Sequence, residues 1–235
     1  MPYFGYLGGL DLIGIAIMLI SLIITTAAQL KVKSAFSKYS QIRSQRGMTA
    51  RDAVYYILRY NGCSDVRVEH ISGSLTDHYD PKAQVIRLSD ATDNSMSIAA
   101  IGVAAHEAGH AAQYHEDYFP MKVRALIIPI SNIGSSLSWL VLIIGLAFSF
   151  PTLCYIGVGL FFFAVLFQLL TLPVELNASR RALNTLSSTN ILTEEEIKGA
   201  RKVLTAAAMT YVAALATSIL QLLRMLLIAN RSRRR

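Results

Sequence analysis

The chain has 235 residues, of which 53% are hydrophobic and 16% are charged. Soluble domains carry roughly 25% charged residues, so the composition indicates a membrane protein and argues against a chain that lies wholly in water. The formal net charge of +7 does not indicate nucleic-acid binding, because the basic residues flank apolar runs and form no recognisable RNA- or DNA-binding motif. The two cysteines, Cys63 and Cys154, lie in segments of very different polarity, which argues against a disulfide framework.

The first apolar segment, residues 10–30, contains one charge, Asp11, and has about the 20 residues that a membrane-spanning helix needs. Lys31 and Lys33 follow it and no basic region precedes it. This order of charges favours an uncleaved anchor over a signal peptide. Residues 34–47 are basic and predict a second helix that lies along the membrane surface.

Residues 31–124 have the mixed composition of a water-exposed domain. A helix is predicted to begin at Thr49 and to end before Gly62. Residues 66–71 and 84–88 alternate between apolar and polar with period two, and a polar, turn-rich stretch separates them. These two runs predict a small antiparallel sheet.

Residues 97–114 contain no proline and many alanines, so they predict a helix, capped near Asn94 or Ser95. The sequence HEAGH, at residues 106–110, lies on this helix. Such a pattern also arises by chance as two surface histidines, but a solvated helix would carry Glu, Lys and Arg. The small residues around the motif instead leave room for other elements to pack against it.

Two further apolar runs, residues 125–150 and 154–172, are separated by Phe150-Pro151-Thr152 and predict a transmembrane hairpin. Residues 203–228 form a fourth apolar segment that contains Arg224. Basic residues next to the first three spans lie on one side, which the positive-inside rule assigns to the cytoplasm. A full fourth span would place the arginine-rich C-terminus on the other side. The last segment therefore either overrides the rule, is re-entrant or lies in the interface.

The HEAGH motif predicts a zinc site. Positions four apart share one helix face, so His106 and His110 can bind one ion while Glu107 projects beside it. Zinc with such ligands lowers the pKa of a water molecule to about 7, and Glu107 can take the proton. For the third ligand we expect Glu175, which follows the third apolar run, where a carboxylate at a membrane edge needs a partner. The alternative is that Glu175 pairs with a neighbouring arginine or a lipid headgroup.

Three residues are candidates for stabilising the oxyanion of peptide hydrolysis, namely His78, Tyr79 and Arg180. The first two stand in an Asp-rich stretch that ends in Pro81, which is also the pattern of a hairpin turn. The third follows an apolar run, where basic residues are expected in any case.

Three segments together resemble the YugP-type neutral zinc metallopeptidases of bacterial membranes: AHEAGHA at residues 105–111, LTDHYDP at 75–81 and ELNASR at 175–180. The resemblance runs through nearly the whole chain. It implies a gluzincin-like site with His106, His110 and Glu175 on zinc and Glu107 as general base. More distantly, the chain is similar to HtpX-like membrane proteases, whose third-ligand motif has an aspartate where this sequence has Ser179. A ligand histidine needs an acceptor that orients it, so this difference bears directly on the site.

We therefore expect a mainly α-helical membrane protein with three to four transmembrane helices and a small α+β, zincin-like (gluzincin) cytoplasmic domain. The expected parts are a first transmembrane anchor (1–30), an extramembrane domain with the HEAGH helix (31–124), a transmembrane hairpin (125–173), a helical segment with the third ligand (174–202), and a fourth apolar helix with a basic tail (203–235).

The expected function is that of a zinc-dependent endopeptidase in a bacterial inner membrane, with its active site on the cytoplasmic side. Expected substrates are peptides or membrane proteins, including misfolded ones, which would make the enzyme part of protein quality control. An extended substrate could add to an edge strand such as residues 84–88. A membrane-protein partner or a homo-oligomer is possible, in addition to the lipid bilayer.

Two other classes of function are alternatives to the peptidase. The first is a non-catalytic, zinc-stabilised scaffold or adaptor, but a structural zinc usually has four protein ligands and no general base. The second is a transporter or channel, which would carry ionisable residues within its spans. Apart from Asp11 at the very start of the first run, Arg224 is the one such residue inside an apolar run, so the sequence favours the peptidase.

Overall fold

The fold is described from a computed structural model, which describes residues 4–233, with side chains from Leu12 onward. Residues 1–3 of the expected anchor, the side chain of Asp11, and Arg234 and Arg235 of the basic tail lie outside the described residues. The chain divides into two compact units. Unit 1 consists of Met1–Ala28, Lys122–Leu172 and Thr210–Arg235, and unit 2 consists of Gln29–Met121 and Pro173–Met209.

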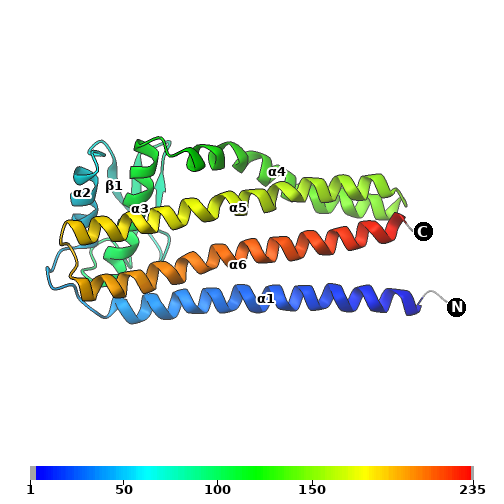
Figure 1. Ribbon diagram of the computed structural model, residues 1–235, viewed down its shortest axis with the longest axis horizontal. Helices are drawn as coiled ribbons and strands as arrows, with labels where there is room; N and C mark the ends of the chain where they lie inside the picture. The colour runs from blue at the N-terminus through cyan, green and yellow to red at the C-terminus, as the bar shows by residue number, and fades with distance from the viewer. Residues whose placement is uncertain (1–3, 234–235) are drawn as a thin grey trace. The chain divides into compact units, whose positions relative to one another are not determined.

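The described chain is mainly helical, and four of its helices are long and apolar enough to cross a membrane. They are α1 (Phe4–Ser40), α4 (Phe119–Ala147), α5 (Pro151–Ser188) and α6 (Glu194–Arg233), shown in Figure 1. Many of their large apolar side chains are exposed, such as Ile23 at 66% and Leu126 at 72%. Exposed apolar surface on this scale suits contact with lipid. The structure thus offers four candidate spans, the larger of the two expected numbers.

Helices α4 and α5 form a hairpin within unit 1, and glycines allow their backbones to approach closely. A Cβ atom on Gly134 would lie 2.8 Å from the carbonyl oxygen of Leu160, and one on Gly145 would lie 2.7 Å from the nitrogen of Cys154. Small residues of this kind are typical of helix pairs in membranes. The turn between the helices covers residues 148–150, next to the break that the sequence predicts.

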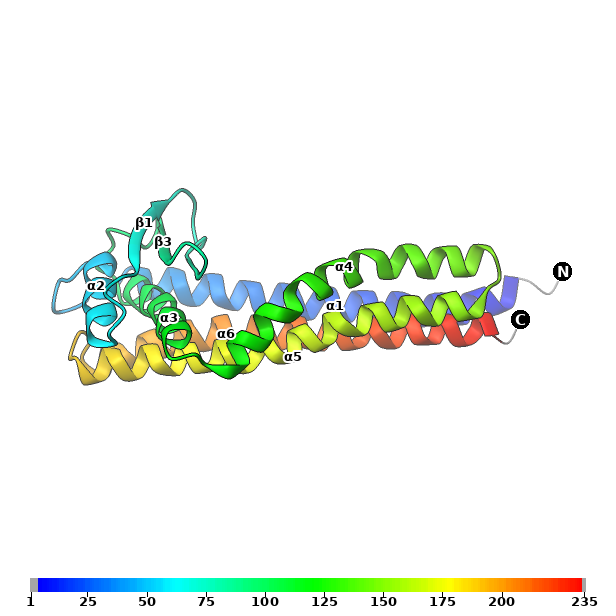
Figure 2. The ribbon, with the colours of Figure 1, turned by 90° about the horizontal axis from the view of Figure 1, so that it is seen from above.

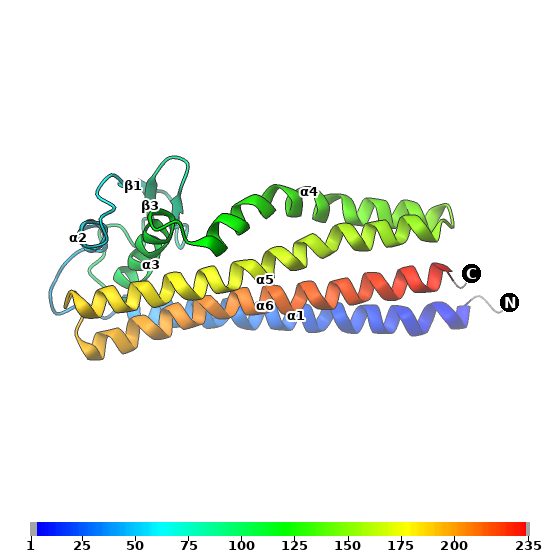
Figure 3. The same cartoon turned by 45° about the horizontal axis from the view of Figure 1, so that its top comes forward.

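Two further features of unit 1 have direct physical causes. Pro129 lies inside α4, where its missing N–H removes a helical hydrogen bond, and Figure 2 shows α4 bending along its length. Helices α1 and α6 run side by side (Figure 3), and a Cβ atom on Gly14 would lie 3.3 Å from Nε of Arg224. The Arg224 guanidinium also lies 5.8 Å from the ring centroid of Trp139, a cation–π contact that suits a cation in apolar surroundings.

Unit 2 contains the short elements and the adjoining ends of α1, α5 and α6. The short elements are α2 (Ala50–Tyr60), β1 (Arg67–Ile71), β2 (His78–Asp80), β3 (Val85–Ser89) and α3 (Ile98–His115). The hydroxyl of Thr49 caps α2 by accepting a hydrogen bond from the Asp52 backbone N–H, as the sequence predicts. Helix α3 begins later than predicted, because its cap is Ser97, whose hydroxyl accepts from the Ala100 N–H.

The sheet differs from the predicted antiparallel pair. Its strand order is β1-β3-β2, in which β1 pairs with β3 in parallel and β2 pairs with β3 antiparallel. The prediction treated the residues between the two apolar runs as a turn, but His78–Asp80 form a third strand on the far side of β3. The chain therefore reverses twice, and β3 runs in the same direction as β1. Strand β3 is central and is not the edge that the sequence suggested; β2 is the edge strand that contacts α3.

A second correction concerns residues 34–47, which the sequence assigned to a separate surface helix. The structure continues α1 without a break to Ser40, and residues 41–49 form turns and irregular backbone. No glycine or proline stands between Leu30 and Ser40, so nothing in the local sequence stops the first helix there.

The core of unit 2 forms around α3. Its buried alanines are Ala100, Ala104, Ala105, Ala108, Ala111 and Ala112. They pack with Ile86 and Leu88 of β3, with Ile57 and Leu58 of α2, and with Leu186 of α5. Small side chains on several faces of α3 let the sheet, α2 and α5 approach its backbone, so the helix that carries the motif is held from several sides.

Candidate metal centre

The HEAGH motif lies in the second half of α3, in unit 2. His106 and His110 stand one helical turn apart, and their ring centroids lie 4.7 Å from each other. The side chain of His106 is 14% exposed and that of His110 is 10% exposed. The two imidazoles therefore share one nearly buried face, as the spacing of four predicts.

Helix α5 brings Glu175 to the two histidines. Its Oε2 lies 3.2 Å from Nε2 of His106 and 3.4 Å from Nε2 of His110. The side chain of Glu175 is 3% exposed. Its carboxylate thus contacts both histidines of the motif, which is the placement expected of a third ligand.

The glycine of the motif explains how α5 comes so close. A Cβ atom on Gly109 would lie 2.6 Å from the carbonyl oxygen of Ala178 and 3.3 Å from its carbonyl carbon. Any larger residue would push α5 away from α3. Because Ala178 follows Glu175 by less than one turn, this contact sets the distance between the carboxylate and the histidines.

Each histidine is oriented by a hydrogen bond at its other ring nitrogen. His106 Nδ1 lies 3.1 Å from the hydroxyl of Ser179, and His110 Nδ1 lies 2.9 Å from Oε1 of Gln113. Ser179 therefore supplies a hydrogen-bond partner for His106, although a hydroxyl, unlike a carboxylate, can both donate and accept. Both Nε2 atoms face Glu175, which is the orientation that a shared ion requires.

The donor set and its spacing fit zinc. The three ligand atoms lie within 4.8 Å of one another. Ligands about 2.1 Å from a tetrahedral zinc lie about 3.4 Å apart, and the two distances to Glu175 are 3.2 Å and 3.4 Å. Two imidazole nitrogens and one carboxylate oxygen also leave a fourth position, as in catalytic zinc sites.

The electrostatics of the site favour a cation. Burial by itself would lower the pKa of His110, but the hydrogen bond and charge of Glu175, aided by the charge of Glu107, outweigh it and raise the pKa above its ordinary value. A positive charge between the imidazoles and the carboxylate is therefore stabilised, whether a proton or a metal ion supplies it.

Glu107 follows His106 on α3, is 8% exposed, and lies close enough to His110 for its charge to act on that imidazole. Among the described residues it forms no hydrogen bond or ion pair with another side chain. Its carboxylate is therefore not used to hold the fold together and can exchange a proton with a molecule that enters the site.

The candidate stabilisers lie in different places. Tyr79 of β2 faces α3, and its ring centroid is 6.2 Å from that of Tyr114. Its neighbour His78 points to the opposite face of the sheet, since side chains alternate along a strand, and its Nε2 lies 3.3 Å from Nη1 of Arg87. Burial raises the pKa of Tyr79 to about 12, so its hydroxyl stays a donor at neutral pH. Arg180 is exposed on α5.

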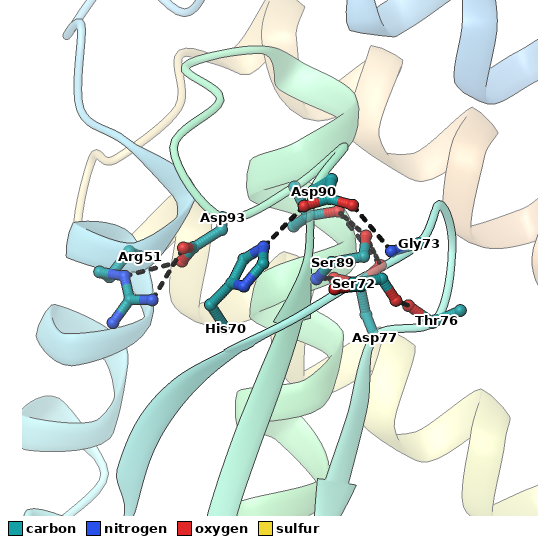
Figure 4. A network of polar contacts seen from close by, with 10 residues as sticks. Arg51, His70, Ser72, Gly73, Thr76, Asp77, Ser89, Asp90 and Asp93 are labelled. Carbon is teal, nitrogen blue, oxygen red and sulfur yellow. Dashed lines mark hydrogen bonds and ion pairs between the residues drawn. The ribbon is translucent and has the colours of Figure 1, made fainter.

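A polar network holds the loop that leads into β2. Asp77 accepts hydrogen bonds from the backbone N–H of Ser89 at 2.8 Å, from the Ser89 hydroxyl at 2.9 Å and from the Thr92 hydroxyl at 3.1 Å. Asp90 accepts from the Gly73 N–H at 2.8 Å. Figure 4 shows these contacts tying both ends of the loop to the end of β3. The loop that contains Gly73 and Asp77 is therefore held by these hydrogen bonds, which also fix the position of β2.

The sequence did not indicate Gln113 or Asn177. Gln113 is fully buried, and its Nε2 donates to the Val174 carbonyl and to Oδ1 of Asn177, both at 2.9 Å. One signal was available, because Gln113 is a large polar residue one turn from His110 in a run of buried alanines.

A helix that carries HExxH, a glutamate from a later helix and four candidate spans are the features of a membrane metallopeptidase. Residues 14–230 match the family described as "Putative neutral zinc metallopeptidase", and the chain belongs to this family. It is similar to the "Putative membrane protease YugP" of Bacillus subtilis (strain 168), with 45% identity over 201 residues, 86% of this chain and 89% of that protein. The resemblance drawn from the sequence is thus confirmed. No solved structure matches the chain.

Proposed function

We propose that this protein is a membrane-embedded zinc endopeptidase of gluzincin type, with His106, His110 and Glu175 as zinc ligands and Glu107 as general base. The observation that carries the proposal is the spacing of the three donor atoms, with Glu107 unengaged beside them. Membership of the zinc metallopeptidase family supports the choice of metal and reaction.

The residues of the site divide the work of peptide hydrolysis. When bound, zinc would act as a Lewis acid that makes a water molecule acidic near neutral pH. Glu107 takes a proton from this water, whose oxygen forms a bond to the peptide carbonyl carbon. The C–N bond then breaks, and Glu107 returns the proton to the leaving amine nitrogen. Tyr79, whose hydroxyl keeps its proton, is the better placed of the two candidate stabilisers on β2 because it faces α3.

The substrate is proposed to bind in extended form along β2. This strand is the edge of the sheet next to α3, so its free side can pair with a peptide backbone. A pocket of about 190 Å³ lies between the sheet and α3, and Tyr79, Gln84, Ala111 and Tyr114 are among the residues that line it. Ala111 and Tyr114 stand four and seven residues after Glu107 and share its helix face. Such binding would recognise the peptide backbone through main-chain hydrogen bonds, so it would suit unfolded segments near the bilayer.

The proposed location is a bacterial inner membrane, with the site on the cytoplasmic side. Four candidate spans and the likeness to a bacterial membrane protease support a multi-pass membrane protein. The side is argued from the basic residues that follow the first and third apolar runs. Substrates would then be membrane-proximal or misfolded proteins, consistent with a role in quality control.

The proposal is tested by metal analysis and by cleavage of an unfolded protein substrate. The purified chain is expected to hold about one zinc. The variant Glu107→Gln should keep the metal and lose cleavage, whereas Arg201→Met, an exposed change elsewhere in unit 2, should keep both the metal and the cleavage. A chain that holds no zinc would disprove the metal site. A Glu107→Gln variant as active as the wild type would disprove the assigned base, and a zinc-loaded chain that cleaves no substrate would favour the scaffold alternative.

A further inference from the structure

A chain of hydrogen bonds runs from Arg181 to the zinc ligand His110. Arg181 Nε donates to Oδ1 of Asn177 at 2.8 Å. The same oxygen accepts from Nε2 of Gln113 at 2.9 Å, and Oε1 of Gln113 lies 2.9 Å from Nδ1 of His110. All four side chains belong to unit 2, two on α3 and two on α5.

The donors and acceptors of these four side chains can be joined by hydrogen bonds in only one arrangement. A guanidinium has five donors and no acceptor, so Asn177 must turn its carbonyl oxygen towards Arg181. Gln113 must then present its NH₂ group to that oxygen. Its second hydrogen goes to the carbonyl of Val174 at 2.9 Å, which can only accept. The other end of the Gln113 amide is therefore the oxygen, and His110 must carry a proton on Nδ1.

We propose that Gln113, Asn177 and Arg181 are positioning residues that hold His110 as the Nδ1–H tautomer, leaving its Nε2 lone pair for the ion. This inference depends on the zinc site proposed above. Gln113 has no exposed surface, so no water can replace its partners. Arg181 does not contact His110, but its hydrogen bond to Asn177 Oδ1 orients the Asn177 amide so that this oxygen also faces Gln113.

Arg181 is itself fixed in place. Its Nη1 donates to Oε1 of Glu116 and its Nη2 lies near Oε2 of the same carboxylate, both at 2.8 Å. Its guanidinium also lies 6.0 Å from the ring centroid of Tyr118. A bidentate contact of this geometry orients the guanidinium plane, so Nε–H points at Asn177.

The other histidine lacks such control. The partner of His106 is the hydroxyl of Ser179, and a hydroxyl can both donate and accept. Either tautomer of His106 can therefore keep this hydrogen bond. The two ligands differ, and His110 is the one whose metal-binding form is imposed by the protein.

The test measures the zinc dissociation constant of the purified full chain by competition with a chelator, with the melting temperature recorded for each variant. Gln113→Leu should weaken binding by about 10- to 100-fold. Arg181→Met should weaken it by about tenfold, because the Asn177 amide can then rotate and offer its NH₂ group to Gln113. Adding Asn177→Asp to Arg181→Met should restore most of the affinity, since a carboxylate offers acceptors at both ends. Arg201→Met, an exposed change in the same unit, serves as the control and should bind as the wild type does.

The outcomes separate this inference from the proposed function. If the wild type binds zinc and both Gln113→Leu and Arg181→Met bind it equally well, the positioning chain is wrong and the zinc site stands. If Asn177→Asp fails to rescue Arg181→Met in a variant that melts normally, Arg181 acts only through its ion pair with Glu116, and its assigned role is overturned. If the wild type itself binds no zinc, both proposals fail together.

Discussion

Replacing Gly109 by alanine should separate α3 from α5 and weaken the metal site. The added Cβ would lie 2.6 Å from the Ala178 carbonyl oxygen, whereas non-bonded heavy atoms are most stable near 3.5 Å, so the overlap is about 0.9 Å. The Ala178 atoms that the Cβ would meet belong to the backbone and cannot rotate away. Overpacking of this kind costs about 1–3 kcal/mol. A shift of about 1 Å at a catalytic group can also reduce a rate about 100-fold.

The matched control is Gly159→Ala on α5, where an added Cβ would meet nothing within 4 Å. That variant keeps only the gain of alanine over glycine in a helix, about 1 kcal/mol. Unfolding in detergent and zinc affinity would be measured for both variants. We expect Gly109→Ala to unfold with about 1–3 kcal/mol less free energy than Gly159→Ala and to bind zinc more weakly. A Gly109→Ala protein with unchanged stability and zinc affinity would refute the view that this contact sets the ligand spacing.

Three further predictions follow from unit 2. Cys63 is fully buried and burial raises its pKa to about 11, so its thiol should resist alkylation at pH 8 and react after denaturation, as mass spectrometry of the labelled peptide would show. Asp77→Ala should lower the free energy of unfolding by about 1–3 kcal/mol, because the buried Ser89 N–H and hydroxyl lose their acceptor; equal melting temperatures would contradict this. Hydrogen bonding by Arg181 lowers the pKa of Glu116 below its ordinary value of 4.5. The contribution of the Glu116–Arg181 contact to the stability of the fold is therefore complete above pH 4.5 and is lost as the pH falls further. The difference in melting temperature between the wild type and Glu116→Gln should vanish in acid.

The parts of the fold that depend on local sequence were predictable. Helix periodicity places His106 and His110 on one face, and Thr49 and the break near Pro151 mark helix boundaries through the backbone preferences of single residues. The four long apolar helices follow from composition and length alone. None of these features requires knowledge of distant contacts.

The parts that depend on tertiary contacts were not predictable in the same way. The direction of β3 follows from a three-residue strand, β2, too short to show a period. Gln113 orients His110 only because α5 supplies its two acceptors, a contact between residues more than 60 positions apart. A sequence pattern could propose Glu175 as a ligand, but the close approach at Gly109 that brings it there is a matter of backbone packing.

The shortness of β2 limits what could dock on it. The strand has three residues, or about 10 Å at the usual rise per residue, and Asp80 at its end is paired with Arg87. Long, flat, apolar edges invite pairing between copies of a protein and aggregation, whereas short charged edges discourage it. An edge of this length would hold only a few residues of an extended segment, such as a frayed terminus or a mobile loop. A polypeptide would then be recognised by whether a short stretch of it is free of its own fold, and an intact folded domain would be left alone.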